Sequence, residues 1–316
     1  MDIFNLTTRP SDKLFYKRND PDDIRLGEIV TSKLENYIKS DIVILGSPQD
    51  EGVIRNKGRD GAKYAPDKIR ESFYKLSAGE RTGAIRIFDL GNIKVEDKLE
   101  EIHRRQEEVV YRLLNDNKKV IILGGGNDIS YPDCRALSQF DNSCLAFNID
   151  SHFDVRSDKI RNSGTSYRML LEENLINPKN FYEIGIKRFS SSTMHRKYLE
   201  GKKCKIFYYD KIKGTRIKKI LNEIIKKKKN NALFWGFDMD AVNSSDAPGV
   251  SAPNPIGLSI DEALLIAEIA GQNKRTKIFE ISEVNPKFDF DDKTSRLAAI
   301  IIWHFLNSIN KKISLK

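Results

Sequence analysis

Acidic side chains and one histidine recur at a spacing of two residues where two apolar runs end. The segments are NIDSHFDVR and FDMD, and the side chains are Asp150, His152, Asp154, Asp238 and Asp240. In an extended chain this spacing places the side chains on one face. Four converging carboxylates repel one another unless cations neutralise them. Oxygen ligands with a single imidazole favour a hard cation, Mn²⁺ more than Zn²⁺, and two divalent ions would balance the four charges.

The alternative is that these aspartates only cap strands and turns at the surface. For any one of them that alternative is the more common case, but the repetition of the pattern at two strand ends disfavours it. A third apolar run ends in LGGGNDIS, with Asn127 after three glycines. This segment lacks the lysine and the glycine spacing of a phosphate-binding loop.

Eight apolar runs alternate with helical patterns along the chain, and several are apolar throughout, as in strands that are buried on both faces. The runs are 41–48, 84–92, 119–126, 143–150, 181–186, 204–209, 232–240 and 277–285. The clearest helical patterns are 97–116, 215–229, 259–272 and 291–309, the third with a Ser259–Glu262 capping box. This alternation predicts an α/β fold with a parallel sheet covered on both sides. Ligands of such sheets bind at the carboxyl ends of the strands, where the acidic pattern lies.

The chain contains no Pro/Gly/Ser-rich linker and no internal repeat. We therefore expect an extended N-terminal arm over residues 1–35, which are polar and proline-punctuated, and a single catalytic domain over 36–316.

Composition excludes several classes of function. The net charge is +9, but the lysine run 226–229 ends an amphipathic helical pattern and lacks interleaved aromatic residues, so we interpret it as a solvated face and expect no nucleic-acid partner. No apolar stretch could span a bilayer, and the first residues lack the pattern of a signal peptide, so we expect no membrane partner. Three cysteines without metal-type spacing fit a reducing, cytoplasmic location.

The acidic segments, together with several others, resemble motifs of the ureohydrolases, the arginase and agmatinase superfamily. The segments are NIDSHFDVR, GFDMDAVNSSDAPGVSAP and EVNP. DEGVIRNKGRDGAKYAPDKIR, SGTSYR and EVNPKFDFDDKTSRLAA are most similar to the formimidoylglutamase branch. The resemblance covers roughly residues 41–303 in chain order.

The resemblance implies a three-layer αβα fold around an eight-stranded parallel sheet, two Mn²⁺ ions per subunit and a homo-oligomer, trimer or hexamer. It implies that Asp150 and Asp238 bridge the two metals, that Asp154 and Asn127 complete one site, and that His152 and Asp240 complete the other. It further implies that Asp154 holds the metal-bridging hydroxide by a hydrogen bond. Two cations lower the pKa of a shared water, which can then attack a planar amidine carbon at neutral pH.

Glu283 in EVNP is similar to the family's acid that faces the cationic nitrogen of the substrate. The alternative for Glu283 is a buried strand-end carboxylate paired with a basic residue.

Two positions depart from the arginase pattern. Arginase-like members have a histidine where this chain has Asn127, and an asparagine is a known variant among formimidoylglutamase-like sequences. Because an amide oxygen is a neutral hard donor, we expect a more weakly held first metal rather than none. Arginases also place a catalytic histidine after the Ser-Gly pair of SGTSYR, where this chain has Tyr167. A tyrosine, with a pKa near 10, is a poor proton shuttle at neutral pH.

Arginines near these motifs indicate the kind of substrate. Arg156 and Arg168 could bind a carboxylate through the planar guanidinium, or could balance the acidic cluster from outside. We also expect Ser163, Tyr167 and Ala252 to contact the substrate.

We therefore predict a manganese-dependent hydrolase that converts N-formimidoyl-L-glutamate and water to L-glutamate and formamide, a reaction of histidine degradation. One alternative is a ureohydrolase of the agmatinase, guanidinobutyrase or arginase type, which releases urea from a guanidino substrate. The other is a metal-poor, non-catalytic relative that acts as a binding protein.

Overall fold

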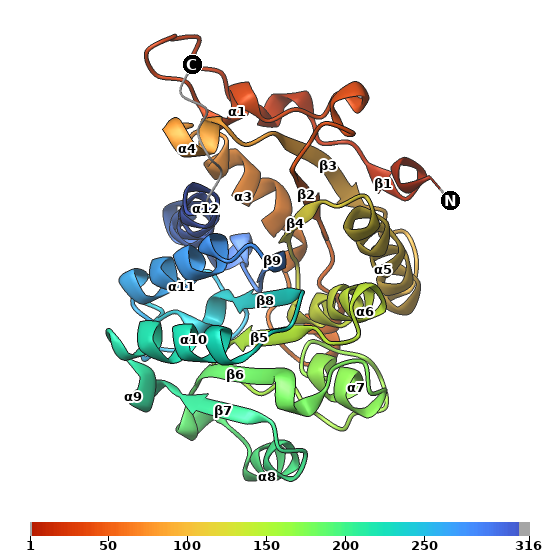
Figure 1. Cartoon of the computed structure of the whole chain (residues 1–316), viewed down its shortest axis with the longest axis vertical. Coiled ribbons are helices and arrows are strands. Elements are labelled where there is room, and N and C mark those ends of the chain that lie inside the picture. Colours follow the sequence, from red (N-terminus) through yellow and green to blue (C-terminus); the bar gives the residue numbers. More distant parts are fainter. Residues whose placement is uncertain (1, 310–316) are drawn as a thin grey trace.

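The computed structural model describes residues 2–309, which form a central sheet between two layers of helices (Figure 1). The nine strands lie side by side in the order β1-β3-β2-β4-β9-β8-β5-β6-β7. They are β1 (Thr7–Thr8), β2 (Ile42–Gly46), β3 (Ile87–Ile93), β4 (Lys119–Leu123), β5 (Leu145–Ile149), β6 (Phe181–Ile186), β7 (Lys205–Tyr208), β8 (Leu233–Asp238) and β9 (Thr276–Ser282).

The eight strands expected from the apolar runs are all present as β2 to β9, and they are mutually parallel. The sheet has nine strands, so the expectation of eight is wrong by one. β1 adds an antiparallel edge strand, in which Thr7 pairs with Ile93. Two residues are too few to produce a recognisable pattern in the sequence, and β1 lies within the predicted arm. The boundary between arm and catalytic domain remains a prediction.

Twelve α-helices cover the sheet within residues 2–309. They are α1 (Leu26–Ile29), α2 (Glu51–Arg55), α3 (Ala65–Phe73), α4 (Glu80–Gly83), α5 (Leu99–Asn115), α6 (Ser130–Phe140), α7 (Ser166–Glu172), α8 (Thr193–Gly201), α9 (Tyr209–Ile212), α10 (Arg216–Lys227), α11 (Ile260–Gln272) and α12 (Lys293–Asn307). Helices α3, α10, α11 and α12 lie on one side of the sheet and α5, α6 and α7 on the other (Figure 1).

Alternate residues of the inner strands enter two separate cores. In β2, Ile42 and Ile44 belong to the core beneath α3, α11 and α12, whereas Val43 and Leu45 belong to the core beneath α5 and α6. This division follows from the two-residue period of a strand. It explains why strands that are buried on both faces have continuously apolar sequences.

The four clearest helical patterns are confirmed within a few residues by α5, α10, α11 and α12. Helix α11 begins with the predicted capping box: the Ser259 hydroxyl accepts a hydrogen bond from the Glu262 amide, and the Glu262 carboxylate accepts one from the Ser259 amide. These two bonds satisfy backbone donors that the first turn of a helix leaves free.

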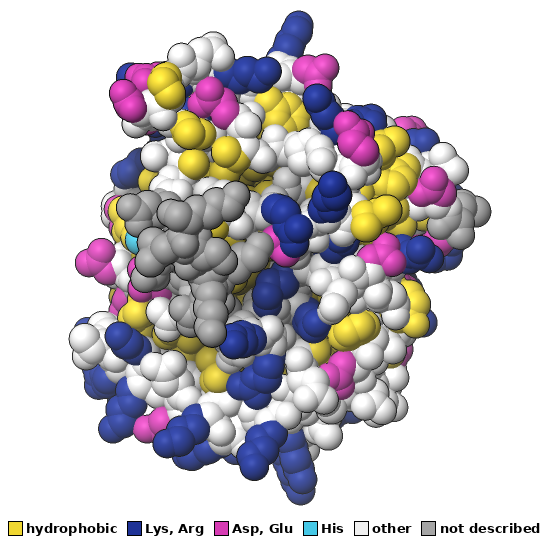
Figure 2. All heavy atoms as spheres, turned by 45° about the horizontal axis from the view of Figure 1, so that its top comes forward, with side chains coloured by type: hydrophobic (Ala, Val, Ile, Leu, Met, Phe, Trp, Pro, Cys, Tyr) yellow, Lys and Arg dark blue, Asp and Glu magenta, His cyan; other side chains and the backbone are white. Residues whose placement is uncertain are grey.

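Helix α10 supports the interpretation of the lysine run. Ile217, Leu221 and Ile224 of this helix are buried, whereas Lys226 and Lys227 at its end are exposed. On the face of the molecule shown in Figure 2, basic side chains are interspersed with acidic, apolar and uncharged ones. None of the helices within residues 2–309 combines the length and the apolar character that crossing a bilayer requires.

The four central strands, β4, β9, β8 and β5, are neighbours in the sheet and parallel to one another. Asn127 follows β4, Glu283 follows β9, Asp238 ends β8 and Asp150 follows β5. The fold therefore brings together, at one edge of the sheet, residues that are far apart in the sequence.

Candidate metal centre and substrate cavity

The aspartates at the ends of β5 and β8 are positioned by tight turns and not by the extended chain that we expected. After β5, the Asp150 carboxylate accepts a hydrogen bond from the backbone amide of His152 at 2.8 Å. After β8, the Asp238 carboxylate accepts one from the amide of Asp240, also at 2.8 Å, and a 3₁₀ turn follows. An aspartate often bonds to the backbone two residues ahead in this way. The prediction of an extended chain is therefore wrong, although the side chains still converge.

Two groups of metal-binding side chains lie next to each other and share Asp150. One group is Asp150, His152 and Asp240, and the other is Asp150, Asp154 and Asp238; within each group the ligand atoms lie within 4.8 Å of one another. This arrangement agrees with the two adjacent sites that the sequence indicates. In this geometry Asp238 belongs to one group only, so its predicted role as a second bridge remains a prediction.

The charges of these groups favour cations. Burial raises the pKa of Asp150, and it raises the pKa values of Asp154 and Asp238 well above the usual range, with neighbouring carboxylates adding to the effect. At Asp240 burial is outweighed by the positive charge of His152, so the pKa is lowered, and Asp240 in turn holds the pKa of His152 well above its usual value.

One buried oxygen of Asp240 has no hydrogen-bond partner. A site of oxygen donors with one imidazole and an unpaired buried oxygen fits a pair of hard divalent cations.

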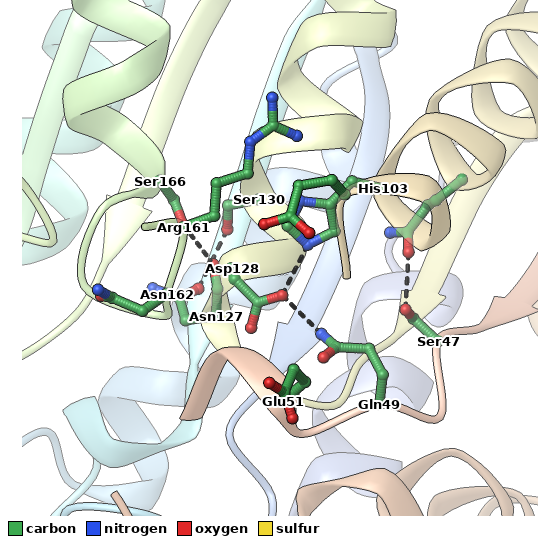
Figure 3. Close-up of polar contacts among 12 residues, drawn as sticks. Ser47, Gln49, Glu51, His103, Asn127, Asp128, Ser130, Arg161, Asn162 and Ser166 are labelled. Carbon is green, nitrogen blue, oxygen red and sulfur yellow. Dashed lines mark hydrogen bonds and ion pairs between the residues drawn. The ribbon is translucent and has the colours of Figure 1, made fainter. Parts of the chain in front are cut away.

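Asn127 lies at the centre of this site, but its amide presents nitrogen to the carboxylates. The nitrogen Nδ2 donates to Asp154 and, at 3.4 Å, to Asp150. The oxygen Oδ1 accepts from the hydroxyls of Ser130, at 3.0 Å, and Ser282, at 2.9 Å. The expected ligand atom therefore points away from the other ligands, and Asn127 could ligate a metal only after a half-turn of its amide. The Asn127–Ser130 contact is drawn in Figure 3.

The glycines before Asn127 allow three chain segments to meet closely. A β-carbon on Gly125 would lie 1.7 Å from the carbonyl oxygen of Gln49, and one on Gly124 would lie 2.7 Å from that of Ile281. The Gly125 carbonyl also accepts the backbone amide of Glu283 at 2.8 Å. These glycines are thus required by close backbone approach, which binds the end of β4 to the ends of its neighbours.

We predict that Asn127→His makes one metal harder to remove. An imidazole nitrogen in place of the turned-away amide adds a ligand to the metal. The rate at which this metal is lost under mild chelation should therefore fall about tenfold, which corresponds to about 1.4 kcal/mol. The measurement is metal release from manganese-loaded protein into a chromogenic chelator. Ser282→Ala, which removes a partner of the amide oxygen and adds no ligand, is the control. Equal release rates for Asn127→His and the parent protein would place position 127 outside the metal ligands.

Glu283 lies between the two halves of the site. It follows β9, which lies between β4 and β8 in the sheet. The carboxylate is 4% exposed and accepts the backbone amide of Asn127 at 2.7 Å. Burial raises its pKa to about 8.

The alternative that Glu283 is paired with a basic residue is not supported, because no ion pair of Glu283 occurs within residues 2–309. Its φ of +64° and the φ of +46° at Asp154 lie in the left-handed region. Such strain, of the order of 1–3 kcal/mol, is typical of functional sites.

Behind Asn127, a buried polar cluster supports the wall of the site. Asp128 contacts His103 and Gln49, each at 2.7 Å, as Figure 3 shows. A β-carbon on Gly52 would lie 2.0 Å from the Asp128 carboxylate, so the loop that carries α2 packs directly against this cluster. His103 therefore has a structural partner within this cluster.

A cavity of about 350 Å³ opens onto the acidic groups. Five residues of the centre line it: His152, Asp154, Asp238, Asp240 and Glu283. The predicted substrate-binding residues Arg156, Ser163 and Ala252 also line it, as do the three serines 190–192. His195 lines it as well. Nothing in the sequence indicates a place for His195 in this cavity, because a histidine inside a helical pattern carries no signal of its own.

Comparisons with known proteins agree with this geometry. A family model described as the arginase family matches residues 40–307. The chain belongs to the arginase family. Among curated relatives of this arginase-family chain, the formimidoylglutamase of Staphylococcus aureus (strain bovine RF122 / ET3-1) is 31% identical over 299 residues, which cover 91% of this chain and 94% of the relative.

Solved structures of formimidoylglutamases have the same fold as this arginase-family chain. The formiminoglutamase of Trypanosoma cruzi, determined with Mn²⁺, has a TM-score of 0.84 at 31% identity over 90% of this chain and 98% of that one. The formimidoylglutamase of Bacillus subtilis has a TM-score of 0.85 at 29% identity over 92% of each chain. The predicted arginase-like fold is confirmed.

Two predicted substrate-binding residues of this arginase-family chain do not line the cavity. Tyr167 is fully buried beneath the sheet edge, where its ring stacks on Phe181 and its hydroxyl donates to Ser130 at 3.2 Å. Burial raises its pKa well above the usual value, so it cannot shuttle protons at neutral pH. Arg168 is held by Glu172 at 2.6 Å and covers the ring of Tyr198. The structure therefore assigns packing roles to both residues.

Proposed function

We propose that this protein is a binuclear manganese hydrolase that cleaves an amidine C–N bond, with N-formimidoyl-L-glutamate as its substrate. The observation that carries the proposal is the pair of acidic groups that share Asp150 at the floor of a cavity whose wall carries Arg156. Formimidoylglutamases are among the most similar relatives. The products would be L-glutamate and formamide.

The residues of the site would divide the chemical work. Asp150, His152, Asp154, Asp238 and Asp240 would hold two Mn²⁺ ions. When bound, such ions lower the pKa of a shared water and so supply a nucleophile at neutral pH. Asp154, whose carboxylate also contacts Asn127, would accept the hydrogen bond that orients this water.

Glu283 would face the amidine from the cavity wall. A carboxylate at this position stabilises the cationic nitrogen of the substrate while the planar carbon becomes tetrahedral. Addition of water to that carbon would be followed by cleavage of the bond to the glutamate nitrogen, and the leaving amine would need a proton. The carboxylate could carry that proton, because burial raises its pKa to about 8.

Arg156 would select the substrate by binding a carboxylate. Its guanidinium lines the cavity, and no hydrogen bond or ion pair of this group occurs within the described part of the chain. A planar guanidinium without a partner matches the two oxygens of a carboxylate. An agmatine-like substrate, whose far end is cationic, would be repelled at the same place. This observation favours formimidoyl-glutamate over agmatine.

We predict that Arg156→Gln raises KM for N-formimidoyl-L-glutamate by about 10- to 100-fold and leaves kcat within a few fold. The loss corresponds to one charge-assisted hydrogen bond, about 1.5–3 kcal/mol. Steady-state kinetics on manganese-loaded enzyme measures both constants. Arg104→Gln, a matched change at an exposed position on α5 where the arginine pairs with Glu101, should leave KM unchanged. An unaltered KM in Arg156→Gln would show that the guanidinium instead balances the acidic centre.

A metal count combined with product analysis tests the proposed function. Protein purified with manganese should contain two metal ions per chain, and it should release formamide and L-glutamate from N-formimidoyl-L-glutamate. Urea from agmatine, guanidinobutyrate or arginine, without turnover of the formimidoyl compound, would indicate the ureohydrolase alternative. Protein without bound metal and without turnover would indicate the non-catalytic alternative.

Three further points belong to the same proposal. We propose that the protein functions in the cytoplasm, because its three cysteines are all buried and unpaired. Its partner would be a small amidine bearing a carboxylate, with no role for nucleic acid or a membrane. The homo-oligomer of three or six chains follows only from the family resemblance and stays a prediction. Light scattering on protein that elutes from a gel-filtration column would check it.

A further inference from the structure

His195 occupies an unusual place among the histidines of this chain. It lies in the first turn of α8, after the capping residue Ser192, and lines the same cavity as Arg156. The other three histidines contact carboxylates: His103 contacts Asp128, His152 contacts Asp150 and Asp240, and His304 contacts Glu268. No hydrogen bond, ion pair or ring contact of the His195 imidazole occurs within residues 2–309.

The charges around His195 come from two other segments. Arg156 lies in the loop after β5 together with Asp158, and Arg168 lies on α7. Burial lowers the pKa of His195, the positive charges of Arg156 and Arg168 lower it further, and Asp158 acts weakly in the opposite direction. Arg168 is neutralised by Glu172, so Arg156 is the unpaired cation that faces His195. In the free protein the imidazole is therefore mostly neutral at pH 7.

An anion bound beside Arg156 would reverse this balance. A carboxylate cancels the positive charge that disfavours the imidazolium, and it offers the imidazolium an oxygen acceptor. The proton would come from solvent or buffer and form an N–H bond on the imidazole, and no bond between heavy atoms would change. A serine-capped helix end adds a weak preference for negative charge at the same place.

We propose that His195 is a specificity-determining residue that takes up a proton when a carboxylate of the substrate binds between it and Arg156. This inference rests on the proposed function and adds to it. The protein would recognise its substrate by two cations, one permanent and one formed on binding. Carboxylate-bearing amidines would then bind more tightly at acidic pH, and cationic amidines would be disfavoured at every pH.

The sign of the pH effect follows from the titration of the imidazole. Below its pKa His195 is charged and supports binding, and above it this support is lost. For the manganese-loaded enzyme we expect KM for N-formimidoyl-L-glutamate to rise about tenfold between pH 6 and pH 8.5, with a much smaller change in kcat. His195→Asn should have a high KM throughout that range. His195→Lys, which keeps a positive charge, should have a low and nearly constant KM.

Calorimetry gives a readout that a merely structural role would not change. Binding of L-glutamate, the proposed product, is measured at pH 7.5 in buffers of different ionisation enthalpy, which reports the number of protons taken up. Wild-type protein should take up a substantial fraction of one proton, whereas His195→Asn and His195→Lys should take up close to none. His304→Asn, which removes a histidine outside the cavity, is the matched control and should behave like the wild type.

The outcomes separate this proposal from the proposed function. Turnover of N-formimidoyl-L-glutamate with the same proton uptake and the same KM profile in wild type and His195→Asn would reject the role of His195 and leave the function intact. A chain that neither hydrolyses that substrate nor binds L-glutamate, but releases urea from a guanidino compound, would reject the function itself. A wild-type KM profile in His195→Lys would also reject the role of His195, because a permanent charge cannot titrate in this range.

Discussion

Replacing Asp238 by asparagine is expected to reduce kcat/KM about 1,000-fold or more while leaving the sheet folded. The change removes one negative charge from the acidic centre, and a loss of about 4 kcal/mol of transition-state stabilisation corresponds to that factor. Asparagine keeps the oxygen that accepts the amide of Asp240 at 2.8 Å, so the turn at the end of β8 should persist. Steady-state kinetics and metal analysis after gel filtration measure the effect.

The same variant should make the metal-free protein more stable, although it lowers activity. Burial raises the pKa of Asp238 well above its usual range, which means that folding disfavours its charged form. Metal-free Asp238→Asn should therefore unfold at a higher temperature than the metal-free wild type. Asp261→Asn, a change at an exposed position on α11, is the matched control and should alter neither property. Normal activity with a single metal per chain in Asp238→Asn would contradict the assignment of Asp238 as a ligand.

Removal of manganese is expected to lower the melting temperature by about 10 °C at pH 7.5. Ions that bind only the folded protein stabilise it by about 2.7 kcal/mol per site at 100 times the dissociation constant. Two sites give about 5.4 kcal/mol, and for a chain of more than 250 residues each kcal/mol changes the melting temperature by about 2 °C. Differential scanning calorimetry on chelated and reconstituted protein measures the difference, and re-addition of Mn²⁺ should restore the higher value.

The difference in melting temperature between the manganese-loaded and the metal-free protein should become smaller on acidification. Asp150, Asp154 and Asp238 have raised pKa values in the folded chain because they are buried. Their contribution to the stability of the metal-free protein is fully present below the unfolded value near 4, and it is lost as the pH rises through the raised values. Asp240, whose pKa is lowered beside His152, acts in the opposite direction but is a single group.

Protons also compete with metals for the same oxygens, so acid weakens metal binding too. Equal melting temperatures with and without chelator from pH 5 to pH 8 would mean that the centre holds no metal.

Much of the fold was predictable from local patterns. The eight parallel strands are continuous apolar runs, and a strand buried on both faces leaves that signature without any knowledge of its neighbours. The start of helix α11 was predictable from Ser259 and Glu262, because capping bonds join residues that are only three apart in the sequence. Asp150 and His152 were predicted for the same reason, because these two members of one candidate metal-binding group are only two residues apart.

The sequence by itself thus determined the eight parallel strands, the main helices and the acidic residues of the centre, since each depends on contacts within a few residues. Tertiary structure alone decided that β9 lies between β4 and β8, that Tyr167 is buried under the sheet edge, and that His195 lines the same cavity as Arg156. It also decided that the amide oxygen of Asn127 is held by Ser130 and Ser282, the latter 155 positions further along the chain. The physical reason is that packing and hydrogen bonding between distant segments, which no local spacing encodes, orient these side chains.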